Sequence, residues 1–563
     1  MRPFAPRVLA GLAAIAGPAA AAPDAIYTNA IVLTLDGQSR VAQSLAVTDG
    51  IIAAVGTDGE VLSTKGPATV VRDLGGRTVI PGFVDAHSHF PGSAVVRNLM
   101  VDLNSPPIGA VKTIDDVVGL LKARAAKLPV GAWLQGSGYD DTLLAEKRHP
   151  TRADLDRVAA DRPIYITHIS GHLAVANSAA LKLAGIDRTT PQPFGGKFRI
   201  DPATNQPDGV LEETAMNKVA ALLPRITDEE IFKAIEDAAA EYAARGVTTA
   251  QSGAASADTI RQAVAALGRG LLPIRFNIWP MVPTRNDILS GKFDPAVPPG
   301  QSFLALTATK GFADGSIQGY TGYLSQPYHS HLHLEPNYRG YPRGEAGELA
   351  AQVLALHKSR VQVAIHANGD AAIDDVLAAY GAAQAADPWP DARHVVVHAQ
   401  MAREDQLDRM AELGVVPSFF VLHVYYWGDR HRDLFLGPER AARISPTASA
   451  LRRGIPFTLH ADTPVVPMNP LLIVWAAVNR VTSSGQVLGP DQRIPAPEAL
   501  KAVTINAARQ EHQESTRGSL ETGKFADFVV LDRNPLAVAP MAIRDLAVLE
   551  TVVGGRAVYR RAE

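Results

Sequence analysis

Two histidines separated by a single residue are the strongest chemical signal in the sequence. Residues 81–89 read PGFVDAHSH, which places His87 and His89 at the end of a short apolar run. Because side chains two residues apart in a β-strand point to the same side, the two imidazoles would project together, as two ligands of one metal ion must. The chain has no cysteine, so nitrogen and oxygen atoms would hold the metal. A His-x-His pair alone also occurs in loops and cores, so further ligands are needed.

Three more polar side chains end apolar runs that have the composition of strands. They are His366, His398 and Asp462. In each run apolar residues alternate with polar ones, so the polar set, which includes His460, would face the inside of a closed sheet. Buried histidine and aspartate cost free energy unless they are hydrogen-bonded, paired or bound to metal. These three residues, together with the His-x-His pair, therefore predict a metal site.

Lys310 lies near the end of a further strand, expected over residues 304–312. One interpretation is a lysine that extends into solvent. The other is a lysine carbamylated by carbon dioxide, whose negative charge would bridge two divalent ions. An unmodified ammonium group is protonated near neutral pH and would repel them. Alternation does not decide the direction of the side chain, because Leu306 and Ala308 share its face.

These side chains require strands that end at a common rim. Apolar runs alternate with alanine-rich helical segments such as 228–245 and 347–358, which is typical of βα units around a parallel sheet. Eight units predict a TIM (β/α)8 barrel, an α/β fold whose active site lies at the carboxyl ends of the strands. The strands are expected at 83–87, 247–251, 274–279, 304–312, 361–366, 394–398, 415–418 and 457–462.

Three segments do not follow this alternation. Residues 91–228 are expected to form a large insertion after the first strand, within a barrel domain at 81–514. Residues 23–80 and 515–563 contain short β-prone runs broken by glycine and aspartate. We expect both ends of the chain to form one small composite β-sandwich domain, although short apolar runs are ambiguous individually.

The first 22 residues have the features of an export signal. Arg2 and Arg7 precede and flank the start of an apolar core at 8–17, and small residues at 19–22 offer cleavage positions. A retained anchor and a start codon assigned too early are the alternatives. No later apolar run reaches the ~18 residues of a membrane span. We therefore expect a soluble mature protein in a bacterial periplasm or outside the cell.

Length and composition limit the class of protein. The 563 residues are 47% hydrophobic and carry a formal net charge of -3. These values exclude a small disulfide-stabilised scaffold and a disordered chain, and they leave no strongly basic surface for nucleic acid. We expect a small-molecule substrate, no nucleic-acid partner and no membrane contact after signal removal, while a homo-oligomer stays open.

Taken together, these residues resemble the amidohydrolase superfamily and, more narrowly, its YtcJ-like or amidohydrolase-3 group. The superfamily has His-x-His on strand 1, a modified lysine on strand 4, histidines on strands 5 and 6, and an aspartate on strand 8. The resemblance covers essentially the whole mature chain. Further support comes from GHLAVANSAAL at 171–181, DGVLE at 208–212, ADGS at 313–316 and GSLETGKFAD at 518–527.

The resemblance implies one or two divalent metal ions, with zinc as the expected metal. The implied ligands are His87, His89 and Asp462 for one ion and His366 and His398 for the second, with carbamylated Lys310 between them. A mononuclear site stays open, because the stoichiometry varies within the group. Such ions lower the pKa of water and polarise a carbonyl group. Asp462 would accept a proton from the attacking water and deliver it to the leaving nitrogen.

Other residues are candidates for contact with the substrate. His172, in a loop of the insertion, and Asp314, just after the fourth strand, are assigned to substrate binding; the alternatives are a structural histidine and a turn or ligand-supporting aspartate. His423 follows the seventh strand among aromatic residues and is assigned as a second catalytic residue that polarises the carbonyl group, against a packed aromatic loop. His460 is expected to be structural. A solvated or pocket-lining loop, rather than a third metal site, is expected for His329, His331 and His333.

The sequence thus predicts an exported, metal-dependent hydrolase that cleaves an amide-type C–N bond, such as an N-acyl or N-formyl group, in a small molecule. Hydrolysis of an ester, lactone or cyclic imide by the same site is the alternative activity. A non-catalytic periplasmic binding protein is a third interpretation. It is disfavoured because a binding protein needs no general base such as Asp462.

Overall fold

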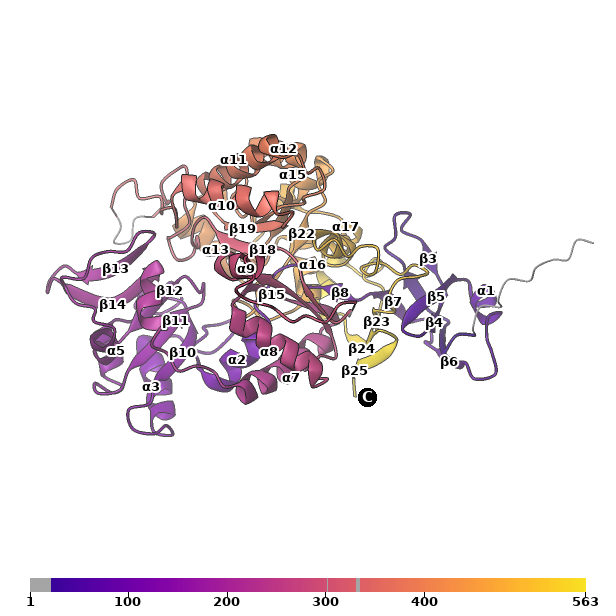
Figure 1. Cartoon of the computed structure of the whole chain (residues 1–563), viewed down its shortest axis with the longest axis horizontal. Helices are drawn as coiled ribbons and strands as arrows, with labels where there is room; N and C mark the ends of the chain where they lie inside the picture. Colours follow the sequence, from indigo (N-terminus) through magenta and orange to yellow (C-terminus); the bar gives the residue numbers. More distant parts are fainter. Residues whose placement is uncertain (1–21, 301, 331–334, 563) are drawn as a thin grey trace, which may run out of the picture.

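The computed structural model describes residues 22–300, 302–330 and 335–562. Figure 1 shows three parts along the longest axis of the molecule: an inserted sheet at one end, a central α/β part, and two sheets near the chain termini at the other end. The expected export signal at 1–22 lies almost wholly outside the described residues, as do His331 and His333, and it stays a prediction. Among the residues that are described, every helix is too short or too polar to cross a bilayer.

The central part is a TIM-barrel-like α/β arrangement of parallel strands (Figure 1). One sheet has the order β17-β16-β15-β8 and the other has the order β18-β19-β20-β21-β22. The first sheet consists of β8 (Phe83–Val84), β15 (Val247–Ala255), β16 (Arg275–Pro280) and β17 (Leu304–Leu306). The second sheet consists of β18 (Thr309–Phe312), β19 (Val363–Ala367), β20 (Val395–His398), β21 (Val416–Phe419) and β22 (Thr458–Leu459).

The fourth expected strand is broken into β17 and β18. At the break, the buried Arg285 guanidinium donates hydrogen bonds to the carbonyl oxygens of Thr307 and Ala308 at 2.9 and 3.3 Å. A parallel bridge between Met281 and Lys310 connects the two sheets there. Within the described residues no strand ladder joins β22 to β8, although Asp462 N donates to the His87 carbonyl oxygen at 3.1 Å just beyond the strand ends.

Helices cover the outside of these strands. They include α7 (Asp228–Ala244), α8 (Ala257–Gly268), α9 (Val282–Leu289), α10 (Ala346–Lys358), α11 (Asp370–Ala386), α12 (Glu404–Leu413) and α16 (Pro470–Asn479). Helix α7 shows why the sequence forms them. The Thr227 side chain accepts a hydrogen bond from Glu230 N at the amino end, and the Glu230 carboxylate in turn accepts from Thr227 N. Ile231, Ile235 and Ala238 recur at helical spacing and are buried.

The segment between β8 and α7 forms a separate six-stranded sheet with the order β13-β14-β12-β11-β10-β9. Its strands are β9 (Val101–Asp102), β10 (Leu134–Tyr139), β11 (Ile164–His168), β12 (Leu173–Ala176), β13 (Gly196–Asp201) and β14 (Gln206–Glu213). Helix α3 (Ile114–Ala125) contributes Val117 and Leu121 to an apolar cluster of its own on this sheet. The insertion therefore has its own core.

Strands from both ends of the chain share one sheet of order β25-β24-β23-β7-β2-β3. These are β2 (Ile31–Leu33), β3 (Val41–Ala42), β7 (Thr78–Pro81), β23 (Phe528–Leu531), β24 (Val548–Val553) and β25 (Arg556–Arg560). A four-stranded sheet contains β1 (Ala25–Thr28), β4 (Ser44–Thr48), β5 (Ile51–Gly56) and β6 (Val70–Asp73). Tyr27, Leu45 and Phe528 bring both sheets into one apolar cluster. The expected limits of the barrel domain, its insertion and the composite β-sandwich domain stay predictions.

Candidate metal centre

The six expected ligands lie together at the carboxyl ends of the central strands. They are His87 and His89 after β8, Lys310 in β18, His366 in β19, His398 at the end of β20 and Asp462 after β22. Asp462 Oδ1 lies 3.2 Å from His89 Nε2 and 3.5 Å from His87 Nε2. Ligand atoms of His87, His398 and Asp462 all lie within 4.8 Å of one another. These distances suit donors that surround a single ion.

His366 and Lys310 complete the cluster. The His366 ring centroid lies 4.6 Å from that of His398, and Lys310 Nζ lies 2.9 Å from His87 Nε2. Burial lowers the pKa of Lys310 to about 7. An amine with this pKa is partly unprotonated near neutral pH, which is the form that reacts with carbon dioxide.

The electrostatics of the cluster favour metal binding. Burial holds the pKa values of His87, His366 and His398 well below the ordinary value, so the rings are neutral, as metal ligands must be. Burial alone would raise the pKa of Asp462, but the close contact with His89 and the charges of the neighbouring histidines hold it well below its usual range. Asp462 Oδ1 is buried and has no hydrogen-bond partner among the described residues. A carboxylate oxygen left in this state fits a divalent cation as its partner.

Each buried histidine of the cluster is held by a second residue at its Nδ1 atom. His87 Nδ1 lies 3.1 Å from Gln251 Oε1, and His366 Nδ1 lies 3.2 Å from Asp314 Oδ1. His398 Nδ1 lies 3.1 Å from His460 Nε2. Such contacts at Nδ1 help to orient the ring, so that Nε2 is the nitrogen that would bind a metal.

Asp314 supports the cluster from behind. Its carboxylate accepts hydrogen bonds from the backbone N–H groups of Tyr323, Asn368 and Gly369 at 2.8–2.9 Å, and its side chain is fully buried. It does not line the cavity beside the cluster. The geometry therefore matches the ligand-supporting alternative and does not bring Asp314 into contact with a substrate.

His423 also lies behind the cavity wall. It begins helix α13 (His423–Arg430), is 2% exposed, and contacts His431 Nε2 through Nδ1 at 3.2 Å. Phe420 packs against both His423 and His398, with ring centroids 4.5 and 6.0 Å away. The structure thus does not place His423 at the cavity, and its catalytic role remains only a prediction. His460 contacts His398 and Ser418, as expected of a structural residue.

A cavity of about 440 Å³ opens beside the cluster, between the strand ends and the inserted sheet. His172, for which substrate contact is predicted, lines this cavity, and its ring centroid lies 4.8 Å from that of His366. Glu213 Oε2 holds His172 Nδ1 at 2.9 Å. The structure adds Arg343 and His168 to the cavity wall. Neither follows from strand spacing, because both reach the cavity from segments outside the eight expected strands.

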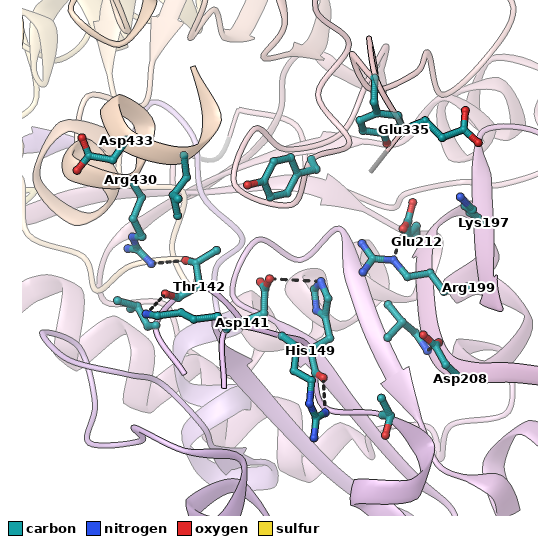
Figure 2. A pocket seen from close by; sticks show the side chains of 18 of the residues that line it. Asp141, Thr142, His149, Lys197, Arg199, Asp208, Glu212, Glu335, Arg430 and Asp433 are labelled. Carbon is teal, nitrogen blue, oxygen red and sulfur yellow. Dashed lines mark hydrogen bonds and ion pairs between the residues drawn. The ribbon is translucent and has the colours of Figure 1, made fainter. Parts of the chain in front are cut away.

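A second and larger cavity of about 1390 Å³ lies between the inserted sheet and the loops of the central part (Figure 2). Arg430 and Thr142 meet on one side of it, and Arg199 meets Glu212 on the other. Arg430 also pairs with Asp140 at 2.7 Å. These charged groups form hydrogen bonds and ion pairs with one another within the cavity wall. The metal-type ligands are concentrated in the smaller cavity, which is therefore the candidate site of reaction.

A second group of metal-type side chains lies between the two cavities. Ligand atoms of Asp140, Asp141 and His168 are within 4.8 Å of one another. However, Asp140 already accepts hydrogen bonds from Arg430, Trp427 and Thr142 at 2.6–3.0 Å. A carboxylate so fully engaged, and with a cation, is a poor metal ligand.

Comparison with known proteins agrees with this geometry. The amidohydrolase family matches residues 70–559. An N-substituted formamide deformylase of Arthrobacter pascens is 33% identical over 96% of this chain and 98% of its own length. A putative amidohydrolase, YtcJ of Bacillus subtilis, is 28% identical over 96% of this chain and 100% of its own length.

Solved structures point the same way. A crystal structure of an uncharacterized metal-dependent hydrolase from Pyrococcus horikoshii superposes with a TM-score of 0.71, at 25% identity, over 92% of this chain and 99% of that one. The zinc complex of the atrazine chlorohydrolase TrzN from Arthrobacter aurescens has a TM-score of 0.54 at 14% identity, over 95% of each chain, and so shares the fold. With its ligand-type side chains gathered at the strand ends and a family match over most of its length, this chain belongs to the amidohydrolase family.

Proposed function

We propose that this amidohydrolase uses divalent metal ions to hydrolyse the C–N bond of small amides, with N-formyl and N-acyl compounds as the substrate class. One observation carries the proposal: the buried Asp462 carboxylate lies among His87, His89 and His398 with an oxygen that no hydrogen bond satisfies in the described chain. The named activity of the Arthrobacter pascens relative supports a formamide or related amide as the substrate.

The chain offers two adjacent sets of ligands. His87, His89 and Asp462 would hold one ion, and His366 and His398 the second. Zinc suits a set of imidazole and carboxylate ligands. When bound, such ions polarise a carbonyl oxygen and lower the pKa of water.

Lys310 is proposed to bridge the two sets as a carbamate. Its Nζ lies beside His87 and the residue is 2% exposed, so an ammonium there would oppose two cations. The uncharged amine attacks carbon dioxide, a C–N bond forms, and the released proton leaves to solvent. The resulting carbamate carries a negative charge where the lysine carried a positive one.

Asp462 is proposed to move the proton during hydrolysis. Its carboxylate lines the cavity and is held by His89, so it can accept a proton from the attacking water and deliver it to the leaving nitrogen. His172 contacts the substrate from the inserted sheet. Glu213 fixes the orientation of the His172 ring, and neighbouring segments of the insertion form part of the cavity wall.

Metal removal and amide turnover test the proposal together. We expect protein purified without chelator to contain one to two metal ions per chain and to release amine from N-substituted formamides or N-acyl amines. Treatment with 1,10-phenanthroline should abolish turnover, and added zinc should restore it. Elemental analysis and amine release are measured on the same sample.

Substitution of Asp462, the proposed proton carrier, is a second test of the proposed function. Asp462→Asn should lower kcat by about 10³-fold, because a general acid–base group contributes 10²–10⁴-fold and this residue is also a ligand. The exposed Asp545 provides a matched control, since Asp545→Asn changes the same group far from the cluster. A zinc-loaded protein that hydrolyses esters but no amide, or an Asp462→Asn variant with normal turnover, would contradict the proposal.

A further inference from the structure

The cavity beside the metal cluster contains a cation that the ligand set does not use. Among the described residues that line it, the side chains with a formal charge are Lys310, Asp462 and Arg343. Lys310 and Asp462 belong to the proposed ligands. Arg343 lies in the segment between β18 and helix α10, and its guanidinium group has no role in the proposed metal site.

Arg343 is held in a defined position at the cavity wall. Its backbone N–H donates to the Ala313 carbonyl oxygen at 2.8 Å, which anchors the segment to the end of β18. Its guanidinium carbon lies 4.4 Å from the centroid of the Phe312 ring. Stacking on a ring uses the face of a guanidinium and leaves its N–H groups, which project from the edge, available for hydrogen bonds.

The nearest carboxylate contacts Arg343 only weakly. Arg343 Nη1 lies 3.5 Å from Glu213 Oε2, and the same oxygen already contacts His172 Nδ1 at 2.9 Å. The adjacent Glu212 faces the larger cavity and pairs with Arg199 (Figure 2), as expected for neighbouring residues at the end of a strand. A guanidinium has five N–H donors, and within the part of the chain that the structure describes this long contact engages one of them.

We infer that Arg343 binds a carboxylate group of the substrate, so that the enzyme acts on N-formyl or N-acyl amino acids. This inference rests on the proposed amide hydrolysis. A guanidinium donates two parallel hydrogen bonds to a carboxylate, which fixes both the position and the orientation of the ligand. With the carboxylate on Arg343, the amide of an amino acid lies a few bonds away, within a cavity that also contains the metal-type ligands.

The rest of the wall suits the side chain of an amino acid. Val95, Val96 and Met100, from helix α2 (Gly92–Leu99) and the residue after it, line the same cavity. Pro464 and Val465, after β22, also line it. A cavity of about 440 Å³ is in the size range of small-molecule sites. An aliphatic amino acid such as leucine, carrying a formyl or short acyl group, matches this combination of charge, apolar surface and size.

Two substrates that differ only in the carboxylate test the inference. These are N-formylleucine and N-(3-methylbutyl)formamide, which is the same molecule without the carboxylate. We expect the wild-type enzyme to have a higher kcat/KM for N-formylleucine, chiefly through a lower KM. In Arg343→Gln, the ratio of the two kcat/KM values should fall by about 10- to 100-fold, the range for loss of hydrogen bonds between charged groups. Arg343→Lys keeps the positive charge but lacks the two parallel N–H donors of a guanidinium. Its ratio of kcat/KM values should therefore lie between those of the wild type and Arg343→Gln.

The same loop provides a matched control. Arg339 is exposed, lies over the Tyr323 ring at 5.4 Å, and does not line the cavity. Arg339→Gln should therefore leave the ratio unchanged. The inference is overturned if Arg343→Gln lowers kcat/KM for both substrates equally, or if the wild-type enzyme prefers the substrate without a carboxylate.

A binding experiment separates this inference from the proposed reaction. N-methanesulfonylleucine and its counterpart without the carboxylate are not amides of a carboxylic acid and are not cleaved, so titration calorimetry on the metal-loaded protein measures binding alone. We expect the carboxylate to tighten binding at least 10-fold in the wild type and not in Arg343→Gln. Equal affinity of the two proteins for N-methanesulfonylleucine would refute the role of Arg343 whether or not amides are hydrolysed, whereas failure of hydrolysis alone refutes the proposed function.

Discussion

At the scale of single residues, Lys310 is the group whose proposed modification would reverse a charge within the candidate metal site. Its amine is buried beside His87, and burial lowers its pKa to about 7, so a substantial neutral fraction exists under ordinary conditions. As an ammonium, Lys310 would oppose two divalent ions; as a carbamate, it would attract them. We therefore propose that the chemical state of this one side chain decides whether the site would hold one ion or two.

Replacing Lys310 tests that state. Lys310→Ala should lose at least half of the bound metal and about 10²-fold or more in turnover, because the bridging anion and the position of both ions are lost. Added propionate should restore part of both, since its carboxylate can occupy the space of the carbamate. Nuclear magnetic resonance with ¹³C-labelled carbon dioxide should show a carbamate signal in the wild type that is absent from the variant. The exposed Lys358 serves as control, and full metal content in Lys310→Ala would rule out the bridge.

Strand alternation explains which residues could be placed from the sequence. His366 and His398 lie in unbroken strands, where a period of two fixes the side on which each residue lies. Lys310 could not be placed, because the strand breaks at Thr307 and Ala308 and alternation counted across a break has no meaning. In β18 itself, Lys310 shares the cavity face with Phe312.

At the scale of elements, the ligands depend on contacts between neighbouring strand ends. Asp314 follows β18, yet its carboxylate binds the backbone N–H groups of Asn368 and Gly369 at the start of helix α11 and orients His366 of β19. One carboxylate thus contacts a loop, a helix end and His366, a proposed metal ligand. Asp314 follows the fourth strand closely in the sequence, but its hydrogen-bond partners come from elsewhere in the chain.

Asp314→Asn tests this arrangement. The amide nitrogen of asparagine would face backbone N–H donors, so at least one buried hydrogen bond is lost and His366 is released. We expect metal affinity or turnover to fall by about 10- to 100-fold, the usual effect of removing a residue that orients a ligand. The temperature of unfolding should also fall, which calorimetry measures. Asp545→Asn again serves as the exposed control, and unchanged metal affinity in Asp314→Asn would show that His366 needs no such support.

Residues beyond the strand ends could not be placed from the sequence, because the alternation of a strand does not extend to them. His423 begins a helix, so the alternation of β21 does not extend to it, and its ring turns behind Phe420. Arg343 and Glu213 reach the cavity from a long loop and from the inserted sheet. Their directions depend on packing between segments far apart in the sequence, which no local period encodes.

At the scale of the whole molecule, the two chain ends meet on one side of the central part (Figure 1). Strand β7 pairs with β23 in antiparallel register, with Val79 opposite Val530. The shared β-rich texture of both ends predicted this association, although the pairing order could not be read from the sequence. The first strand of the central part follows directly from β7, so the terminal sheet and the metal cluster share one continuous support.

A buried ion pair joins these two parts. Arg275 of β16 donates to both oxygens of Asp527, just before β23, at 2.7 and 3.0 Å, and both side chains are at most 3% exposed. Gly554 N donates to the same carboxylate at 2.8 Å, and the Phe525 ring covers the guanidinium at 3.9 Å. Asp527 ends the GSLETGKFAD stretch, so that motif acts as a structural connection far from the chemistry.

Breaking this pair should destabilise the enzyme without changing its chemistry. Asp527→Ala leaves a buried arginine charge uncompensated, and we expect the free energy of unfolding to fall by about 3–5 kcal/mol. The first unfolding transition should occur at a lower denaturant concentration than in the wild type. The kcat at low temperature and the metal content should stay near wild type, since neither residue lines the metal cavity. The double variant Arg275→Met/Asp527→Leu should recover much of the loss, because it removes both charges. If the double variant is no more stable than Asp527→Ala, an uncompensated charge is not what destabilises Asp527→Ala. The stabilising effect of the pair would then come from packing rather than from charge.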